Sequence, residues 1–387
     1  MSLAKAEEGC PANQFPSDLD HDCAAVSEYD HLRTGNEPMT FVGRQISMHI
    51  AWVAAEGVIT KDTPATFAKF LKSYDGKITD VIEFHSPGGN LAAALELGRM
   101  IRRAGYKTRI GRTISLKGTM NVYFYKKAFC LSACAYAFIG GVARSYGTND
   151  VYGLHRFGLE KGAVAGDVAQ SVTSEIAKYL EDMGVDQGAL EVASSANFKT
   201  EMRFVPVELA KKLRIIFDPN QPYPFVIEDV KGVTVASTRL FLHNRFYNAR
   251  VYCVTGLGPT LIVSAPKSAF PAALLGLKDT LASFSGNGEP LYGLLNSESL
   301  SDGLSYLQFI IPKLQPRHFL GNGFSLKQVA NKSLPPLPTK INPDNRKQMD
   351  SLMKRIAWAD AVTAISFTMR SDNAERTLPI ILRNCHQ

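Results

Sequence analysis

Three short stretches of the sequence carry residues whose types and spacing could support nucleophilic catalysis. The first reads C-L-S-A-C-A-Y-A-F-I-G-G over 130–141, where every residue is apolar or small except Ser132. The second is S-P-G-G at 86–89, and the third is G-L-H-R-F at 153–157. Together they predict a serine nucleophile, a glycine turn that supplies an oxyanion hole, and a histidine base.

Each role follows from what the residue type can do. A serine hydroxyl is a weak nucleophile unless a base removes its proton and donors stabilise the oxyanion that forms. Ser132 stands where a helix is expected to begin, so the backbone N–H of Ala133 is the natural first oxyanion donor. Gly88, in a turn without side chains, is the expected second donor. His155, at the end of a predicted strand, is the expected general base.

Each motif also has a purely structural interpretation. S-P-G-G on its own is a common turn, and a serine in an apolar helix usually bonds to a backbone carbonyl. A histidine after a strand is more often structural than catalytic. Only the joint occurrence, in this order and on these elements, favours catalysis. Other catalytic patterns are missing from the sequence, which has no G-x-S-x-G elbow, no P-loop and no H-E-x-x-H motif.

Alternating strands and helices are expected to position these motifs. Strands are predicted within 46–59, over 80–84 and over 106–110, and helices over 64–74 and 91–104 lie between them. Short strand–helix–strand units imply right-handed crossovers and a mainly parallel sheet. The sequence therefore predicts an α/β fold in which S-P-G-G follows directly on a strand.

The alternation is interrupted at 113–129, where polar turn residues and V-Y-F-Y predict an extra hairpin or loop that leads into Ser132. A strand ending near His155 follows. Further helices are predicted over 167–183, 186–195 and 206–213.

A change of composition divides the chain. Residues 218–224 hold three prolines in seven residues, which is typical of a linker, and the sequence beyond is rich in β-forming residues. In this half a helix is predicted over 344–358 and strands over 361–369 and 376–384. It shows no clustered catalytic residues, which favours dimerisation, partner binding or stabilisation as its role. The expected segments are an irregular N-terminal arm over 1–38, an α/β domain over 39–218, a linker over 219–224, and a C-terminal β-rich α+β domain over 225–387.

Length and composition narrow the function further. With 387 residues the chain is long enough for two domains. The net charge of +7 is spread over scattered Lys and Arg, without a basic tail or a zinc-finger spacing, so no nucleic-acid partner is expected. No apolar run reaches the ~18 residues of a membrane span. No metal-ligand spacing or cofactor motif occurs, so neither a metal nor a cofactor is expected.

The cysteines leave two interpretations open. Six occur, at positions 10, 23, 130, 134, 253 and 385. Cys130 and Cys134 are spaced i,i+4 and would share a helix face at a bridgeable distance, and Cys10 and Cys23 bracket a short polar segment. Six free thiols in a reducing compartment are the equal alternative. The first ten residues lack the apolar core of a signal peptide, as in a cytoplasmic protein or a mature chain without its leader.

On these motifs the first domain resembles the ClpP/crotonase superfamily, and the ClpP-type serine peptidases more than the acyl-CoA enzymes. In that family an S-P-G-G turn supplies an oxyanion donor, as 86–89 would here. The nucleophile precedes an apolar, Ala/Gly-rich helix, as Ser132 does, and a strand ends in the catalytic histidine, as at His155. The similarity covers about 45–218. It implies a ClpP/crotonase-like, mainly parallel sheet with crossover helices, and assembly into a homo-oligomer.

The layout also resembles uncharacterised periplasmic ClpP-like proteins of bacteria, which have cysteines around the serine and an additional C-terminal domain. That resemblance implies a periplasmic location, in which a Cys130–Cys134 or Cys10–Cys23 disulfide could persist.

The sequence departs from the family at the third member of the triad. ClpP-type peptidases carry an aspartate two residues before a phenylalanine that precedes a short helix, and Met202 occupies that position here. Glu201 is the expected substitute if the strand shifts by one residue, and Asn197 is a weaker candidate. A serine–lysine dyad through Lys126 or Lys127 is a further alternative. Loss of the orienting acid usually lowers activity steeply without abolishing it.

These observations lead us to expect a serine hydrolase, and within that class a peptidase, acting on a peptide or another acyl substrate. Ser132 would attack, His155 would move the proton, Gly88 and Ala133 would hold the oxyanion, and Glu201 would orient the histidine. A catalytically weak ClpP-like protein used for binding or assembly is the alternative. Crotonase-type acyl-CoA chemistry at the same turn is the third hypothesis.

Overall fold

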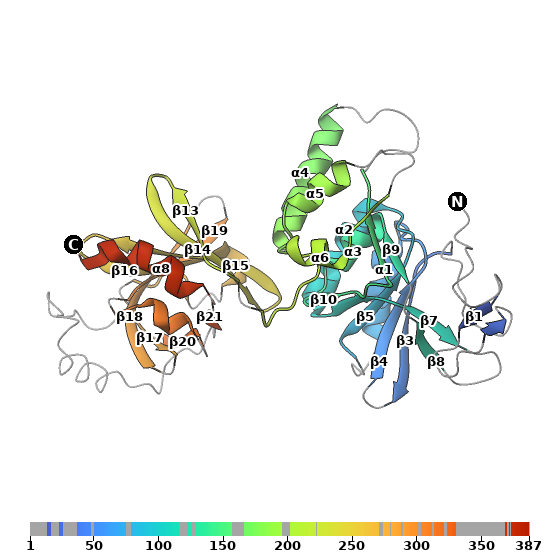
Figure 1. Cartoon of the computed structure of the whole chain (residues 1–387), viewed down its shortest axis with the longest axis horizontal. Coiled ribbons are helices and arrows are strands. Elements are labelled where there is room, and N and C mark those ends of the chain that lie inside the picture. The colour runs from blue at the N-terminus through green and yellow to red at the C-terminus, as the bar shows by residue number, and fades with distance from the viewer. Residues whose placement is uncertain are drawn as a thin grey trace. The chain divides into compact units, whose positions relative to one another are not determined.

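The computed structural model divides the chain into two compact units, Met1–Pro219 and Asn220–Gln387 (Figure 1). The division falls inside the proline-rich segment 218–224. The structure describes residues 14–16, 23–25, 37–47, 50–74, 79–115, 122–125, 128–156, 166–195, 202–221, 223–270, 274–278, 280–287, 289–300, 303–311, 313–320, 323–329, 368–369, 371 and 373–386.

A five-stranded sheet forms the frame of the first unit, in the order β10-β6-β5-β4-β3. Figure 1 labels β3, β4, β5 and β10 of this sheet. Neighbours among β4, β5, β6 and β10 run parallel, and β3 pairs antiparallel with β4 at one edge. All five residues of β5 are buried, as a central parallel strand covered on both faces requires. The strands are β3 (Thr40–Ser47), β4 (Ile50–Glu56), β5 (Val81–His85), β6 (Lys107–Ile110) and β10 (Arg144–Ser145).

A second sheet of three strands, in the order β12-β11-β9, lies against the end of β5. Its strands are β9 (Phe129–Leu131), β11 (Val151–Leu154) and β12 (Arg203–Phe204). β9 and β11 run parallel, and β12 is antiparallel to β11. Just after β5, the Ser86 N–H donates to the Phe129 carbonyl, and the Leu131 N–H donates to the Ser86 carbonyl. The ends of β5, β9 and β11 are therefore neighbours.

Helices connect the strands of this unit. They are α1 (Thr63–Ser73), α2 (Leu91–Ala104), α3 (Ala133–Phe138), α4 (Gly166–Asp182), α5 (Gly188–Ser194) and α6 (Val207–Lys212). The start of α2 is fixed by Asn90, whose side-chain oxygen accepts from the Ala93 N–H at 2.9 Å. Its end is fixed by Gly105 at φ 75°. α2 packs on α3, which carries the apolar C-A-Y-A-F stretch into the core.

The mixed α/β fold with a parallel sheet is confirmed. In addition to the helix expected after Ser132, five helices are predicted before residue 219. The predicted bounds of each agree with the observed bounds to within two residues. Of the hairpin or loop predicted over 113–129, the hairpin is present, because β7 (Arg112–Ser115) pairs antiparallel with β8 (Val122–Tyr125).

Two buried arginines tie the end of α3 to the rest of the first unit. Arg102 and Arg144 are 5% and 2% exposed, and each donates to several backbone carbonyls. Carbonyls at a helix end lack partners within the helix, so a guanidinium with five N–H donors can satisfy several of them at once. The acceptors are the carbonyls of Ile139, Gly140, Gly141, Met183, Arg214 and Ile215.

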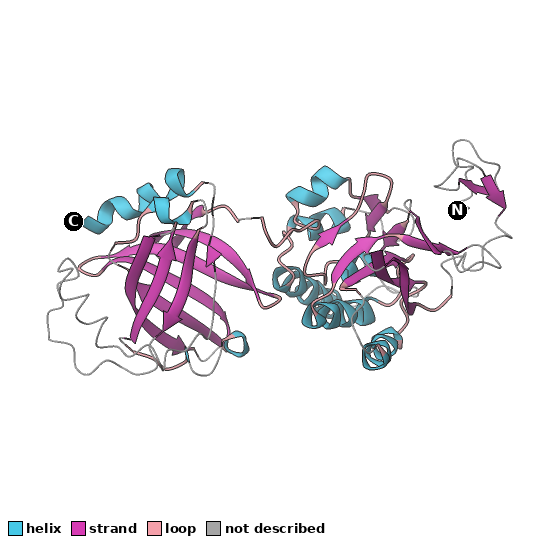
Figure 2. Cartoon of the chain, turned by 90° about the horizontal axis from the view of Figure 1, so that it is seen from below, coloured by secondary structure: helices cyan, strands magenta, loops and turns pink. Residues whose placement is uncertain are grey.

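The second unit is built on an antiparallel sheet of nine strands, in the order β13-β14-β15-β16-β19-β18-β17-β20-β21. Figure 2 shows this sheet as strongly curved, with helical segments along one side. α8 (Ala374–Leu382) packs against β14 and β15. The strands are β13 (Val226–Val230), β14 (Val233–Leu242), β15 (Arg245–Val254), β16 (Gly258–Pro266), β17 (Thr280–Gly286), β18 (Glu289–Ser299), β19 (Leu304–Ile310), β20 (Phe324–Val329) and β21 (Thr368–Met369). Short 3₁₀ turns are η2 (Lys267–Ala269), η4 (Pro316–Phe319) and η6 (Arg383–His386).

The strand predicted over 376–384 is wrong, because α8 covers most of it. The nearly continuous apolar run T-L-P-I-I-L is typical of a buried strand. In the structure, however, Leu378, Ile381 and Leu382 are buried at a helical spacing, and Ile380 is 53% exposed. The helix predicted over 344–358 lies outside the described residues, and of the strand over 361–369 only β21 lies within them.

In the segment predicted as an irregular arm, β1 (Gln14–Pro16) pairs antiparallel with β2 (Cys23–Ala25), so irregularity is wrong for these residues. Among the helices of the described ranges, none is both long and apolar enough to cross a membrane.

Candidate active site

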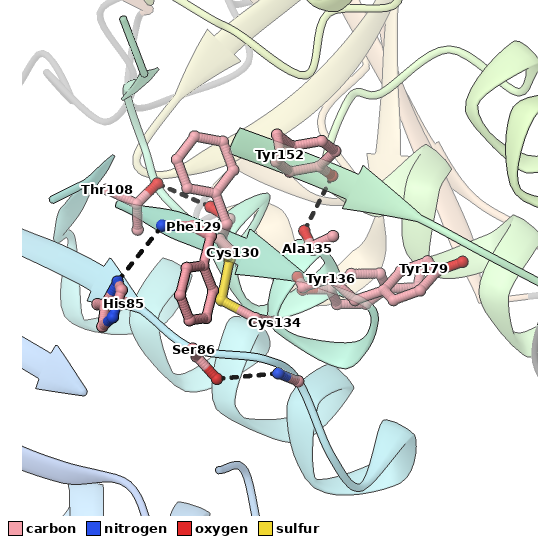
Figure 3. The surroundings of a disulfide bond; sticks show 12 residues. His85, Ser86, Thr108, Phe129, Cys130, Cys134, Ala135, Tyr136, Tyr152 and Tyr179 are labelled. Atoms are coloured by element: carbon pink, nitrogen blue, oxygen red, sulfur yellow. Dashed lines mark hydrogen bonds between the residues drawn. A yellow bond between two sulfur atoms is a disulfide. The ribbon is translucent and has the colours of Figure 1, made fainter. Parts of the chain in front are cut away.

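Ser132 occupies the sharp turn between β9 and α3. Its backbone has φ 55° and ψ −123°, a region that costs a residue other than glycine about 1–3 kcal/mol. Neighbouring contacts hold this conformation. The Ser132 N–H donates to the Gly153 carbonyl at 2.9 Å, and a disulfide joins Cys130 to Cys134 on either side, with the two Cα atoms 5.2 Å apart (Figure 3). The turn presents the Ser132 side chain at a half-buried position.

The hydroxyl of Ser132 lies 2.6 Å from Nε2 of His155. The residues meet because β9 and β11 are neighbouring parallel strands, and each side chain follows directly on the end of its strand. On the other side of the ring, Nδ1 lies 2.7 Å from the backbone carbonyl oxygen of Arg156. Because a carbonyl only accepts, Nδ1 carries the proton and Nε2 keeps its lone pair for the serine hydroxyl.

Gly88 lies against the nucleophile, as an oxyanion donor must. It adopts φ 105°, and a Cβ at this position would be 2.7 Å from the Ser132 Cβ and 3.0 Å from the Ala133 nitrogen. Both the backbone and the space therefore require glycine. The Gly88 N–H donates to Ser86 Oγ at 3.1 Å within the turn (Figure 3), so it would share this hydrogen with an oxyanion. Ala133 is the first residue of α3, so its N–H has no partner within the helix.

Met202 lies where the orienting acid is expected. β12 pairs with β11 so that Leu154 is opposite Arg203, and continuing this register sets Met202 opposite His155. The Met202 side chain also lies against Gly153, since a Cβ there would be 2.7 Å from Met202 Cγ. The observed pairs show no shift by one residue, so the extended register puts Met202, and not Glu201, opposite the base. Glu201, Asn197, Lys126 and Lys127 lie outside the described residues.

The helix behind the nucleophile is anchored by buried tyrosines. The Tyr152 hydroxyl donates to the Ala135 carbonyl at 3.1 Å (Figure 3), and the Tyr179 hydroxyl donates to the Tyr136 carbonyl at 2.7 Å. With the arginine contacts at the end of α3, these bonds fix the backbone that follows Ser132. Such anchoring is what a serine in a strained turn needs to keep one position.

His85 is the last residue of β5 and directly precedes the turn 86–89. It is 3% exposed, and its Nδ1 accepts from the Phe129 N–H at 3.4 Å (Figure 3). Burial, with the positive charge of Arg112 nearby, lowers the pKa of His85 to about 3. The imidazole is therefore neutral at ordinary pH and accepts a hydrogen bond from β9 just before the turn.

The structure brings together Ser132, His155, Gly88 and Ala133 among the residues singled out by the sequence. It adds two features that sequence reasoning left open or missed. The Cys130–Cys134 bond was one of two alternatives, and the Arg156 carbonyl gives no sequence signal because every residue has one. Across the described ranges, no group of three or more His, Cys, Asp or Glu residues is placed to hold a metal ion.

Comparison with known proteins gives matches only among solved structures, since no family model and no curated protein matches the chain. The chain is similar to a mutant of the 1510-N membrane-bound stomatin-specific protease, with 16% identity, TM-score 0.31, and coverage of 43% of this chain and 75% of that one. It is also similar to ClpP1 from Listeria monocytogenes, with 17% identity, TM-score 0.31, and coverage of 43% of this chain and 88% of that one. A third similar structure is a probable enoyl-CoA hydratase/isomerase from Mycobacterium abscessus, with 10% identity, TM-score 0.28, and coverage of 46% of this chain and 67% of that one. The functional proposal therefore rests on the geometry of the site.

Proposed function

We propose that the first unit is a serine hydrolase, and specifically a peptidase of the ClpP-like type. The observation that carries the proposal is the 2.6 Å contact between Ser132 Oγ and His155 Nε2, made by a serine held at φ 55°. A serine with a purely structural role would require neither a strained backbone nor a hydrogen bond to a histidine nitrogen. Gly88 and the Ala133 N–H lie beside it, where the charge of an oxyanion would develop.

The proposed reaction has two acyl-transfer steps. Ser132 Oγ bonds to the acyl carbon of the substrate while its proton moves to His155 Nε2, and the Gly88 and Ala133 N–H groups donate to the oxyanion. The tetrahedral intermediate then breaks its bond to the leaving amine, which takes the proton from Nε2. Water attacks the acyl-serine with His155 as the base, and releases the acid and the free hydroxyl.

An activity-based probe tests the covalent step. A fluorophosphonate should label the wild-type protein and should not label Ser132→Ala or His155→Ala. Ser195→Ala is the matched control, because Ser195 is a serine of the same unit whose hydroxyl donates to the carbonyl of Val192, and it should be labelled like the wild type. Absence of labelling in the folded wild-type protein would reject the proposal.

A second candidate function is binding or assembly through a catalytically weak ClpP-like fold. Met202 opposite His155 favours it, because a thioether neither orients an imidazole nor stabilises its positive charge. Under this alternative the wild type would resist the probe at concentrations that label a complete triad. Crotonase-type chemistry has no such support, since the strained serine is of no use to it.

The surroundings of the enzyme are part of the same proposal. Disulfides join Cys130 to Cys134 and Cys253 to Cys385, and such bonds persist in oxidising compartments. They support a periplasmic location. We also propose a homo-oligomer with no nucleic-acid partner, to be checked by sedimentation of the native protein.

A further inference from the structure

We propose that Arg156 is the positioning residue of this site. Its backbone carbonyl takes the place that the orienting acid has in a complete triad, and its guanidinium holds that carbonyl in position. The inference deepens the proposed serine–histidine mechanism and rests on it.

The first observation is the contact behind the imidazole. His155 Nδ1 lies 2.7 Å from the Arg156 carbonyl oxygen, which is the distance of a well-formed hydrogen bond. This carbonyl belongs to the residue directly after the histidine. It reaches back to Nδ1 only while the backbone after β11 keeps one particular turn. In that turn the proton is held on Nδ1 and the ring plane is fixed, which are two tasks of the acid in a complete triad.

The second observation is what holds the turn. The Arg156 guanidinium donates from Nε at 3.2 Å and from Nη2 at 2.6 Å to one acceptor, the carbonyl oxygen of Ser194. Ser194 is the last residue of α5, where helix carbonyls lack partners within the helix. Hydrogen bonds from a charged donor are stronger than those between neutral groups. Ala189 and Ala193 anchor α5 in the core, so the residue after the base is tied to a packed helix.

A carbonyl performs only part of the acid's work. It orients the ring and selects the tautomer, but it carries no full negative charge to stabilise the imidazolium that forms during attack. We therefore expect a slower nucleophile than in a complete triad, and one whose rate depends on how firmly the carbonyl is held. Met202 is compatible with this arrangement, because an acid on β12 is then not required.

The chain offers a matched control in Arg203. Its Nη2 donates to the carbonyl of Ser195 at 3.3 Å, so it is also an exposed arginine bound to a carbonyl at the end of α5. It differs in position, since it lies in β12 opposite Leu154, whereas Arg156 directly follows the histidine. Comparing Arg203→Ala with Arg156→Ala therefore separates the general effect of removing a surface guanidinium from the loss of the group that holds the carbonyl behind His155.

The experiment measures the maximal rate and the half-saturation constant of fluorophosphonate inactivation, together with the tautomer of His155. Arg156→Ala should lower the maximal inactivation rate about tenfold while the probe's half-saturation constant stays unchanged, since one charge-assisted contact is lost. Arg156→Lys, with a single donor group, should restore part of the rate. Arg203→Ala should react like the wild type. In ¹⁵N NMR spectra, the His155 ring should be protonated at Nδ1 in the wild type and mixed in Arg156→Ala.

The outcomes separate this inference from the proposed function. A wild-type His155 protonated at Nε2 overturns the inference, and so does an Arg156→Ala protein with unchanged tautomer and rate. A rate loss in Glu201→Gln that Arg156→Ala does not share overturns it in favour of a carboxylate. If the wild type is not labelled at all, the proposed function fails, but the tautomer of His155 still decides whether the Arg156 carbonyl holds the ring. Matching thermal unfolding of the variants shows that a rate change is not loss of the fold.

Discussion

At the scale of single residues, Ser132 combines a reactive position with an unfavourable backbone. Glycine adopts φ 55° and ψ −123° readily, whereas a side chain there is strained. The strain persists because the disulfide and the bond to the Gly153 carbonyl fix the chain on both sides.

Replacing Ser132 by glycine or by alanine separates strain from reactivity. Both variants lose the hydroxyl and should not be labelled. Ser132→Gly should exceed Ser132→Ala in free energy of unfolding by about 1 kcal/mol, because glycine relieves about 1–3 kcal/mol of strain and loses part of this to the greater entropy of its unfolded chain. Urea unfolding of the two variants measures the difference. A less stable glycine variant would show that the turn is not strained.

His85 gives a pH-dependent term in stability. Its pKa is lowered to about 3 in the folded protein, against an ordinary value of 6.5, so between these values the unfolded chain binds a proton that the folded chain does not. Stability contributed by neutral His85 is therefore present above pH 6.5 and is lost as the pH falls toward 3, by at most ~1.4 kcal/mol per pH unit.

His85→Asn should flatten this dependence, since an amide keeps an acceptor and does not titrate. The difference in unfolding free energy between pH 4 and pH 7 measures it. His243→Asn, at an exposed histidine of the second unit, should leave the difference as in the wild type. An unchanged pH dependence in His85→Asn would show that His85 is charged in the folded protein, against the burial that lowers its pKa.

At the scale of elements, the Cys130–Cys134 disulfide joins the middle of β9 to the first turn of α3 and so closes the turn that contains Ser132. Both cysteines are fully buried. Replacing both by alanine should lower the free energy of unfolding by about 2 kcal/mol for so short a loop. Labelling of Ser132 should also slow, by about tenfold if the strained turn relaxes by ~1.4 kcal/mol. Urea unfolding and probe labelling measure the two effects.

The second disulfide is the control for the first. Cys253 and Cys385 join β15 to η6 in the other unit. Replacing both by alanine should destabilise that unit and leave the labelling rate unchanged. Equal rates in the Cys130/Cys134 variant and the wild type would mean that hydrogen bonds alone hold the nucleophile's turn.

The elements show why part of the site could be predicted from the sequence. S-P-G-G, Ser132 and His155 each stand where a strand ends, and strand ends are marked by local signals such as glycine and a change of period. Parallel strands bring such ends to one edge, which gives the constellation. β3 was missed because its antiparallel pairing with β4 has no local signature, and α8 was read as a strand because its apolar residues are nearly continuous.

What could not be predicted depends on backbone geometry. The register between β11 and β12, when extended by one pair, sets Met202 opposite His155, and a register of one residue more would bring Glu201 there. The Arg156 carbonyl reaches the imidazole through a turn that no residue type announces. The choice between free thiols and a Cys130–Cys134 bond likewise needed the positions of the two chains around Ser132.

At the scale of the whole molecule, each unit has an apolar core of its own. The first is centred on residues such as Phe84 and Leu97, and the second on residues such as Leu295 and Phe309, all of them fully buried. The residues proposed for the chemistry, together with the groups that hold them, come from the first unit alone. Units with separate cores can fold separately.

A split of the chain after Pro219 tests this independence. The fragment Met1–Pro219 should unfold cooperatively and should be labelled at Ser132 at the rate of the whole chain, because the described partners of Ser132 and His155 all belong to this fragment. The fragment Asn220–Gln387 should fold with its Cys253–Cys385 bond and should not react. Calorimetry and probe labelling of the two fragments measure this. If the first fragment folds but reacts slowly, then the second unit contributes to the active site. If it reacts fully, the second unit is left with recognition or assembly as its role.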